Sequence, residues 1–136
     1  MGRGRRADVV WRMNLLLDTH IYLWMRTDSA RLSPAQREAM TDPRNVIFLS
    51  AVSASEIAVK QSIGKLNSTA PLLDDIAVIG LRELPFTFAH ARELEALPLL
   101  HRDPFDRMLI AQARAENMTL LTVDSQIARY DVPVIQ

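Results

Sequence analysis

The most constraining feature of the sequence is a run of three leucines, residues 15–17, that ends at the acidic residue Asp18. An apolar run this short is typical of a strand that is buried on both faces, as strands are in parallel sheets. Thr19 and His20 follow, and the next apolar residues are spaced as in a helix that reaches about Met25. Open α/β sheets bind their ligands beyond the carboxyl ends of the strands, so Asp18 is predicted to anchor a metal site there.

The rest of the chain alternates between segments of the same two kinds. Ser33 before Pro34, and Asp103 before Pro104, each predict a helix N-cap followed by proline at the first helical position. Further strands are predicted at 46–49, 81–84, 119–122 and 132–135, and further helices at about 34–41, within 50–63, and at 72–79, 87–97 and 104–117. This alternation predicts a single α/β domain with a central, mostly parallel sheet of four to five strands, flanked by helices on both faces.

Composition limits the classes of function. The 136 residues carry 16 acidic and 16 basic side chains, so that contact with a nucleic acid would need a local basic patch. The chain has no cysteine, which excludes disulfides and thiolate metal ligands. No apolar run approaches the roughly 20 residues of a membrane helix, and a cytoplasmic location is expected by default. Residues 1–12 are basic and glycine-interrupted, and are predicted to be a flexible leader to a folded domain at 13–136.

Glu56 is the second candidate site residue. At helical spacing it shares a stripe with Val52, Val59 and Ile63, which are expected to face the core. A carboxylate carried toward the core is costly unless it is paired or bound to a metal. The alternative is purely structural, because Ser53 and Glu56 have the spacing of a capping box.

Asp106 lies in the first turn of the helix that Asp103 and Pro104 open, where the helix dipole favours a negative charge. It shares a helix face with Ile110 and Ala113, which lie four and seven positions further along the chain. The Asp106 side chain therefore need not point to solvent. Capping accounts for Asp103 by itself, although that residue is also an additional candidate for the site.

Asp124 repeats the arrangement at Asp18, because it follows the apolar strand predicted at 119–122. Its structural alternative is an N-cap for the turn at 125–129. Thr19 and Thr122 lie beside these two acids, and their hydroxyls either orient a carboxylate or a metal-bound water or serve as caps.

The four acids carry more weight together than singly. Asp18 and Asp124 follow strands, Glu56 and Asp106 lie near helix starts, and in a parallel α/β sheet these positions share one edge. Carboxylates gathered there repel each other unless divalent cations neutralise them. Oxygen ligands favour Mg²⁺ or Mn²⁺, and such a site suits phosphodiester hydrolysis.

In this order and context, the four acids resemble those of the PIN-domain ribonucleases, and most nearly those of VapC-type toxins of bacterial toxin–antitoxin pairs. The resemblance covers about residues 13–136 and is carried by LLLDTH at 15–20, SASEI at 53–57, HRDPFDRMLIAQA at 101–113 and LLTVD at 120–124. It implies endonucleolytic cleavage of RNA by a water activated by Mg²⁺ or Mn²⁺. It also implies a homodimer and an antitoxin segment that blocks the cleft. Asp18 and Asp106 are predicted as the principal ligands, completed by Glu56 and Asp124.

Basic side chains flank these acids. Arg107 and Arg102 either hold the scissile phosphate or pair with Asp103 or Asp106. Lys60 either pairs with Glu56, meets RNA phosphate or is solvated. His20 and His101 either take part in proton transfer or are ordinary packing and surface residues. Tyr22, Trp24 and Met25 are expected in the core or in a groove for the antitoxin.

Two other classes of function remain open from the residues. One is phosphoryl transfer through an aspartyl phosphate on Asp18, as in haloacid-dehalogenase-like enzymes. Those enzymes carry a second acid two residues after the first, where this chain has His20. The other is a non-catalytic binding module that uses the same pocket to hold a partner. This hypothesis predicts that the protein neither binds Mn²⁺ nor turns over a substrate.

Overall fold

The computed structural model describes residues 12–66 and 71–136. Its centre is a five-stranded sheet in the order β3-β2-β1-β4-β5, in which every neighbouring pair is parallel. The strands are β1 (Asn14–Leu17), β2 (Val46–Ser50), β3 (Leu81–Leu84), β4 (Thr119–Leu121) and β5 (Val134–Ile135). The parallel α/β architecture predicted from the alternation is confirmed.

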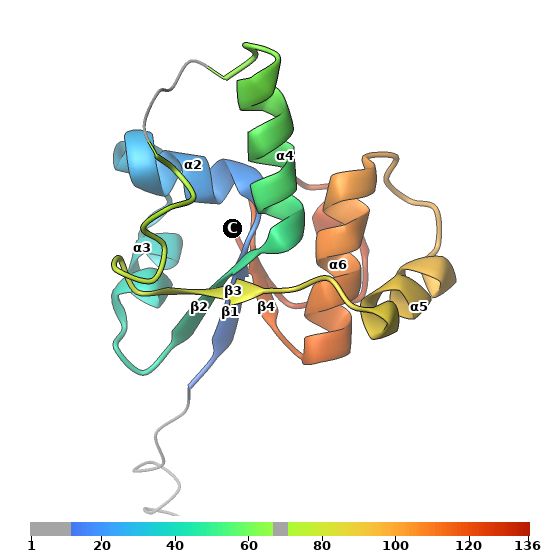
Figure 1. The fold of residues 1–136 in the computed structure, drawn as a ribbon. Helices are drawn as coiled ribbons and strands as arrows, with labels where there is room; N and C mark the ends of the chain where they lie inside the picture. The colour runs from blue at the N-terminus through green and yellow to red at the C-terminus, as the bar shows by residue number, and fades with distance from the viewer. Residues whose placement is uncertain (1–11, 67–70) are drawn as a thin grey trace, which may run out of the picture.

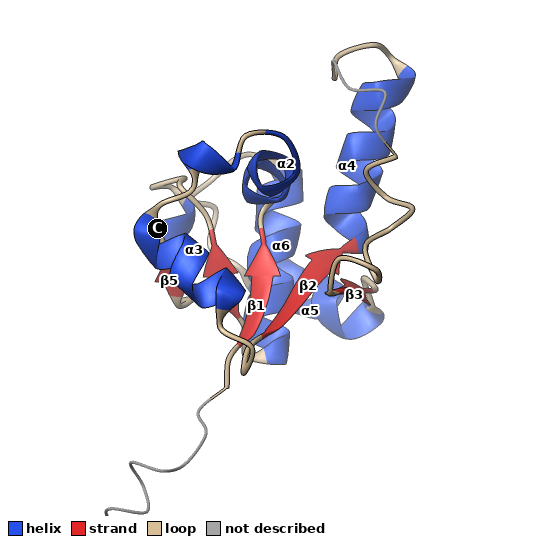
Figure 2. Cartoon of the chain, turned by 90° about the vertical axis from the view of Figure 1, so that its left-hand side faces the viewer, coloured by secondary structure: helices blue, strands red, loops and turns tan. Residues whose placement is uncertain are grey.

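Helices cover both faces of this sheet. They are α2 (Thr19–Thr27), α3 (Pro34–Thr41), α4 (Ala51–Ser62), α5 (Phe88–Ala96) and α6 (Pro104–Glu116), with short 3₁₀ turns η1 (Ser29–Arg31) and η2 (Ile127–Arg129). Figure 1 and Figure 2 show α2 and α3 on one side of the strands and α5 and α6 on the other. In the part of the chain that the structure describes, no helix is long and apolar enough to span a membrane.

The leucine run explains why β1 occupies the middle of the sheet. Alternate side chains of a strand point to opposite faces. Leu16 packs with α6 and Leu120 of β4 in one core cluster, whereas Leu15 and Leu17 pack with α2 in the other, and all are fully buried. The three leucines are buried on both faces, so the polar residues stand at the two ends, with Asn14 as the first residue of the strand and Asp18 just after its carboxyl end.

Several predicted boundaries are confirmed by their caps. Ser33 accepts a hydrogen bond from the Gln36 N–H and forms a capping box, with Pro34 as the first residue of α3. Asp103 is the N-cap of α6, where its side chain accepts the N–H groups of Phe105 and Asp106, and Pro104 is the first residue of the helix. Residues 1–11, most of the predicted leader, lie outside the described residues.

The helix predicted at 72–79 is wrong, because the structure has a series of turns there. Tertiary contacts account for the difference. The Leu72 carbonyl accepts a hydrogen bond from the Tyr22 hydroxyl. The Asp75 carboxylate accepts hydrogen bonds from Nη1 and Nη2 of Arg26 at 2.9 and 3.0 Å. These contacts with α2 hold the segment in a shape that helical periodicity alone does not predict. Tyr22 is fully buried and belongs to the core.

The strand order locates the site-bearing edge of the sheet. From β1 the chain crosses to β2 and β3 on one side, and later returns to β4 and β5 on the other. The strand order therefore reverses between β1 and β4, and the carboxyl ends of strands at such a point are where open α/β sheets bind their ligands. The Asp18 N–H donates to the Leu121 carbonyl at 3.0 Å, which joins the two strand ends.

Candidate metal centre

Asp18 lies at the carboxyl end of β1 and is 3% exposed. It is also the N-cap of α2, where its Oδ1 accepts the Ile21 N–H at 2.8 Å. Burial raises the pKa of this carboxyl, and the charge of Asp124 raises it further, whereas hydrogen bonds from the Thr122 hydroxyl and the Ile21 N–H lower it. The cost of holding this carboxylate ionised is what a bound cation would offset.

Asp106 projects from the first turn of α6, as predicted. Its pKa is raised to about 6, chiefly because the carboxyl is removed from water, while the hydrogen bond from His101 lowers it. The charges of Asp103 and Asp18 raise this pKa as well. Asp18 and Asp106 are 88 positions apart in the chain, yet the charge of one acts on the other, so they share one electrostatic environment.

Asp124 reaches the same region from the segment after β4. Its N–H donates to Thr122 Oγ1 at 3.0 Å, and its Oδ1 accepts the Gln126 N–H at 2.8 Å. The bond from Gln126 is a local contact with the turn that begins at residue 125, but the 3₁₀ turn η2 has Gln126, not Asp124, as its N-cap. The other carboxylate oxygen, Oδ2, lies 3.2 Å from His101 Nε2.

His101, for which the sequence indicates proton transfer or an ordinary packing or surface role, connects two of the acids. Its Nε2 lies 2.8 Å from Asp106 Oδ2 and 3.2 Å from Asp124 Oδ2. One ligand atom from each of these three residues falls within 4.8 Å of the others. The sequence signal for this arrangement is weak, because the histidine is in a loop and its place depends on how that loop folds.

Glu56 is buried, as is Val52 of its predicted stripe, but the expectation that Val59 and Ile63 also face the core is wrong, because they are 53% and 59% exposed. Glu56 has two partners. Its Oε1 accepts the Thr19 hydroxyl at 2.7 Å, and its Oε2 pairs with Lys60 Nζ at 2.9 Å. The capping-box alternative is wrong, because α4 begins at Ala51 with Ser50 as its N-cap, three residues earlier than that box requires. Glu56 is thus linked to the residue that follows Asp18, and Lys60 is its counter-ion.

The remaining predicted residues have defined contacts. Asp103 Oδ1 accepts the N–H groups of Phe105 at 2.9 Å and Asp106 at 3.1 Å, which is the capping role. Arg107 Nη1 donates to the Pro98 carbonyl at 2.9 Å and to the Tyr130 hydroxyl at 3.2 Å. A phosphate-binding role for Arg107 stays a prediction.

The donor set suits a hard divalent cation. Asp18, Asp106 and Asp124 offer carboxylate oxygens, the ligands that Mg²⁺ and Mn²⁺ prefer. Asp18 and Asp106 each have a pKa that burial raises most and a neighbouring acid raises further, as expected of carboxylates that lie close together. The chemistry of these donors therefore fits such an ion. Among the described residues, the group whose ligand atoms lie within 4.8 Å of one another consists of Asp106, Asp124 and His101, without Asp18 or Glu56.

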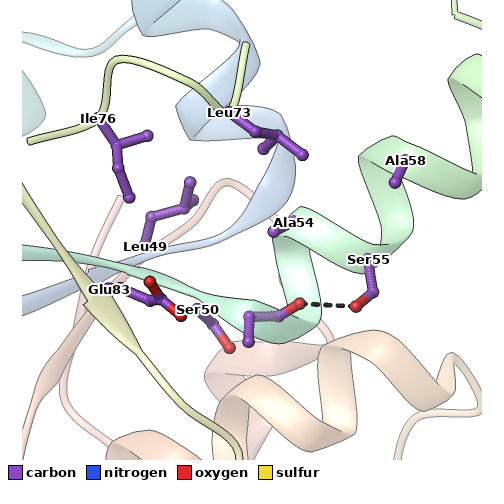
Figure 3. A pocket seen from close by; sticks show the side chains of 9 residues that line it. Leu49, Ser50, Ala54, Ser55, Ala58, Leu73, Ile76 and Glu83 are labelled. Atoms are coloured by element: carbon purple, nitrogen blue, oxygen red, sulfur yellow. Dashed lines mark hydrogen bonds between the residues drawn. The ribbon is translucent and has the colours of Figure 1, made fainter.

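A separate cavity of about 380 Å³ lies between α4, the end of β2 and the segment at 73–76. Figure 3 shows Ala54 and Ala58 of α4 facing Leu73 and Ile76 across it. Of the side chains that line it, only Glu83 is ionisable, and none of the four acids takes part. This apolar cavity offers no set of groups for metal binding or hydrolysis.

Comparison with known families gives one match. The model of the PIN domain family matches residues 15–133. Curated proteins give no significant match.

Solved structures share the fold at low identity. VapBC2 of Rickettsia felis, bound to a promoter DNA fragment, has a TM-score of 0.70 at 16% identity, covering 90% of this chain and 98% of that chain. FitAcB of Neisseria gonorrhoeae has a TM-score of 0.61 at 21% identity, covering 90% and 96%. A toxin–antitoxin complex of Klebsiella pneumoniae has a TM-score of 0.60 at 17% identity, also covering 90% and 96%.

Proposed function

The chain belongs to the PIN domain family, and on this premise we propose that it is a metal-dependent endoribonuclease and the toxin of a toxin–antitoxin pair. One observation carries the proposal. Asp106 and Asp124 come from distant segments of the chain and meet at one imidazole, because His101 Nε2 lies 2.8 Å from Asp106 Oδ2 and 3.2 Å from Asp124 Oδ2. The buried Asp18 belongs to the same environment, since its charge raises the pKa of Asp106 and the charge of Asp124 raises its own. Such a cluster of carboxylates is suited to holding a dication for phosphodiester hydrolysis.

Each acid has a proposed role. Asp18 and Asp106 are the principal ligands for Mg²⁺ or Mn²⁺, and Asp124 and Glu56 complete the site. When bound, the cation supplies activation of water and stabilises the negative charge that develops on the phosphate. Thr122 and Thr19 hold the Asp18 and Glu56 carboxylates through their hydroxyls. Asp103 holds the start of α6, and thereby the backbone of Asp106.

The substrate is proposed to be RNA. Because the chain has no net charge, contact with the phosphate backbone has to be local. Arg102 is exposed and is adjacent to His101, and Arg107 lies in the first turns of α6. These two arginines are proposed to contact the phosphates on either side of the scissile bond.

The test is a cleavage assay with single-stranded RNA, structured RNA and DNA, with Mg²⁺, with Mn²⁺ and with excess chelator. We expect metal-dependent cuts within RNA, and a loss of about 100-fold or more in Asp18→Asn, as for the removal of a principal electrostatic group. Glu95→Gln, which neutralises an exposed acid on α5, is the matched control and should cleave as the wild type does. Equal cleavage by Asp18→Asn would refute the metal site, and absence of both Mn²⁺ binding and turnover would indicate a binding module.

An antitoxin partner and a homodimer are part of the proposal. Structures that share this fold were solved as toxin–antitoxin complexes. Exposed apolar side chains near the end of α4, Val59 at 53% and Ile63 at 59%, offer a surface for a protein partner. We expect the chain to act in the cytoplasm, where RNA is available, so its expression in bacteria should arrest their growth. Co-expression of the small open reading frame next to its gene, as the antitoxin, should restore growth. Sedimentation of the purified chain reports the homodimer.

A further inference from the structure

His101 lies between two carboxylates that the chain brings together from distant segments. Asp106 belongs to α6, and Asp124 follows β4. The imidazole Nε2 is 2.8 Å from Oδ2 of the first and 3.2 Å from Oδ2 of the second. The histidine side chain is 17% exposed, so its contacts with the two acids compete little with water.

The backbone determines which ring nitrogen carries the proton. The Arg102 N–H donates to His101 Nδ1 at 3.1 Å, so Nδ1 presents its lone pair. In the neutral ring the hydrogen is then on Nε2, which donates toward the carboxylates. A histidine that ligates a metal through Nε2 needs the opposite tautomer, with Nδ1–H donating to an acceptor. The geometry at Nδ1 therefore favours a hydrogen-bond donor over a metal ligand.

A buried tyrosine fixes the loop that carries this histidine. The Tyr130 hydroxyl oxygen accepts the N–H groups of Leu100 at 3.0 Å and His101 at 2.9 Å. Arg107 Nη1 donates to the same oxygen at 3.2 Å and to the Pro98 carbonyl at 2.9 Å. Tyr130 is 4% exposed and belongs to the core cluster of α6, so the loop is tied to the same layer as Asp106.

We propose that His101 is a positioning residue of the metal centre, which donates its Nε2–H to Asp106 and Asp124 and fixes the rotation of both carboxylates without ligating the cation. This inference rests on the proposed function, because it assigns the histidine a role toward that same centre. Hydrogen bonds to ligating groups orient them, and their loss typically weakens metal binding by about 10- to 100-fold.

The test measures Mn²⁺ binding by calorimetry on the full chain without RNA. We expect the Kd of His101→Ala to rise by about 10- to 100-fold. His101→Gln, whose amide N–H reaches a position similar to Nε2–H, should restore binding to within a fewfold of the wild type. Leu99→Ala removes an exposed side chain of the same loop, 76% exposed, and should leave the Kd unchanged. An unchanged Kd in His101→Ala would overturn the inference, as would a failure of His101→Gln to restore binding when its thermal melt matches that of the wild type.

A second measurement uses the wild type and so does not depend on any variant folding. Pulsed electron paramagnetic resonance of the Mn²⁺-loaded chain should show no directly coordinated nitrogen. A coordinated ¹⁴N would make His101 a ligand and overturn the positioning role. Wild-type protein that binds no Mn²⁺ would overturn the proposed function together with this inference. If the wild type binds Mn²⁺, then an unchanged Kd in His101→Ala, a failure of His101→Gln to restore binding, or a coordinated nitrogen would overturn the inference alone.

Discussion

The Thr19 hydroxyl lies 2.7 Å from Glu56 Oε1, and this contact joins the first residue of α2 to the second turn of α4. The same hydroxyl lies 3.1 Å from Ser53 Oγ. Since Thr19 is adjacent to Asp18, the hydroxyl fixes Glu56 relative to the end of β1. A buried carboxylate is thereby provided with a donor on one oxygen, while Lys60 neutralises the other.

Replacing Thr19 by valine keeps the shape of the side chain and removes this donor. A buried acceptor that loses its partner typically costs about 1–3 kcal/mol, so the free energy of unfolding should fall by about that amount. Urea denaturation measures the change. Thr27→Val, which removes an exposed hydroxyl at the end of the same helix, is the control and should change stability less. Equal losses in the two variants would contradict a special role for the Thr19–Glu56 contact.

The raised pKa of Asp106 makes stability depend on pH. The folded chain holds the proton up to about pH 6, whereas the unfolded chain releases it near the ordinary value of 3.8. Between these two values the folded state binds more protons, so this group's contribution to stability falls as pH rises from about 4 to about 6. Asp106→Asn removes the titration, and should therefore become more stable than the wild type as pH rises through this window.

Chelator has to be present in that experiment, because a bound cation would stabilise the ionised carboxylate. The side chain is partly exposed, at 22%, so we expect a gain of about 1 kcal/mol at pH 8, well below what the pKa shift alone would give. Thermal melts of both proteins at pH 4, 5, 6 and 8 measure how the stability difference between Asp106→Asn and the wild type changes with pH. A gap between the two proteins that stays constant with pH would exclude this carboxyl as the source.

Tyr130→Phe removes the acceptor that holds the loop of His101. The N–H groups of Leu100 and His101 then lose their partner, and we expect a loss of about 1–3 kcal/mol together with weaker Mn²⁺ binding. Tyr22→Phe provides the comparison, because its hydroxyl holds the Leu72 carbonyl, which belongs to neither the loop nor the acid cluster. That variant should lose stability with its Mn²⁺ affinity unchanged. Equal Mn²⁺ affinities in Tyr130→Phe and Tyr22→Phe would contradict the prediction that the loop held by Tyr130 supports metal binding.

The sequence predicted best what short-range patterns determine. Periodicity placed Asp18 at the end of a buried strand, and Ser33-Pro34 predicted the start of α3 at the residue where the structure has it. The prediction at 72–79 was wrong because Arg26, almost 50 positions away, holds that segment through Asp75. Local propensity carries no information about such a partner.

The contacts within the candidate site show the same limit. The sequence indicates Asp18 and Asp124 because they follow strands, Asp106 because it lies in the first turn of a helix, and Glu56 because helical periodicity turns it toward the core. The link between His101 and Asp124 depends on where the loop before α6 lies, and that loop is held by Tyr130, 29 positions further along. The donor from Thr19 to Glu56 likewise spans 37 positions. Only the folded chain reveals which side chain faces each carboxylate.

Lys60 offers a test of whether Glu56 belongs to the metal centre. Its Nζ lies 2.9 Å from Glu56 Oε2, one helical turn away, and the lysine side chain is 39% exposed. Lys60→Met leaves the glutamate buried without its counter-ion, and stability without metal should fall by about 1 kcal/mol because the pair is partly solvated.

Added Mn²⁺ should then raise the melting temperature of Lys60→Met by more than that of the wild type. A cation held by Glu56 would replace the lost positive charge, and a ligand that binds only the folded state stabilises it. Lys65→Met, which removes an exposed lysine just beyond α4, is the matched control and should show the wild-type shift. If Lys60→Met and Lys65→Met respond to Mn²⁺ equally, Glu56 does not contribute to the cation site, and the ligand set reduces to the three aspartates.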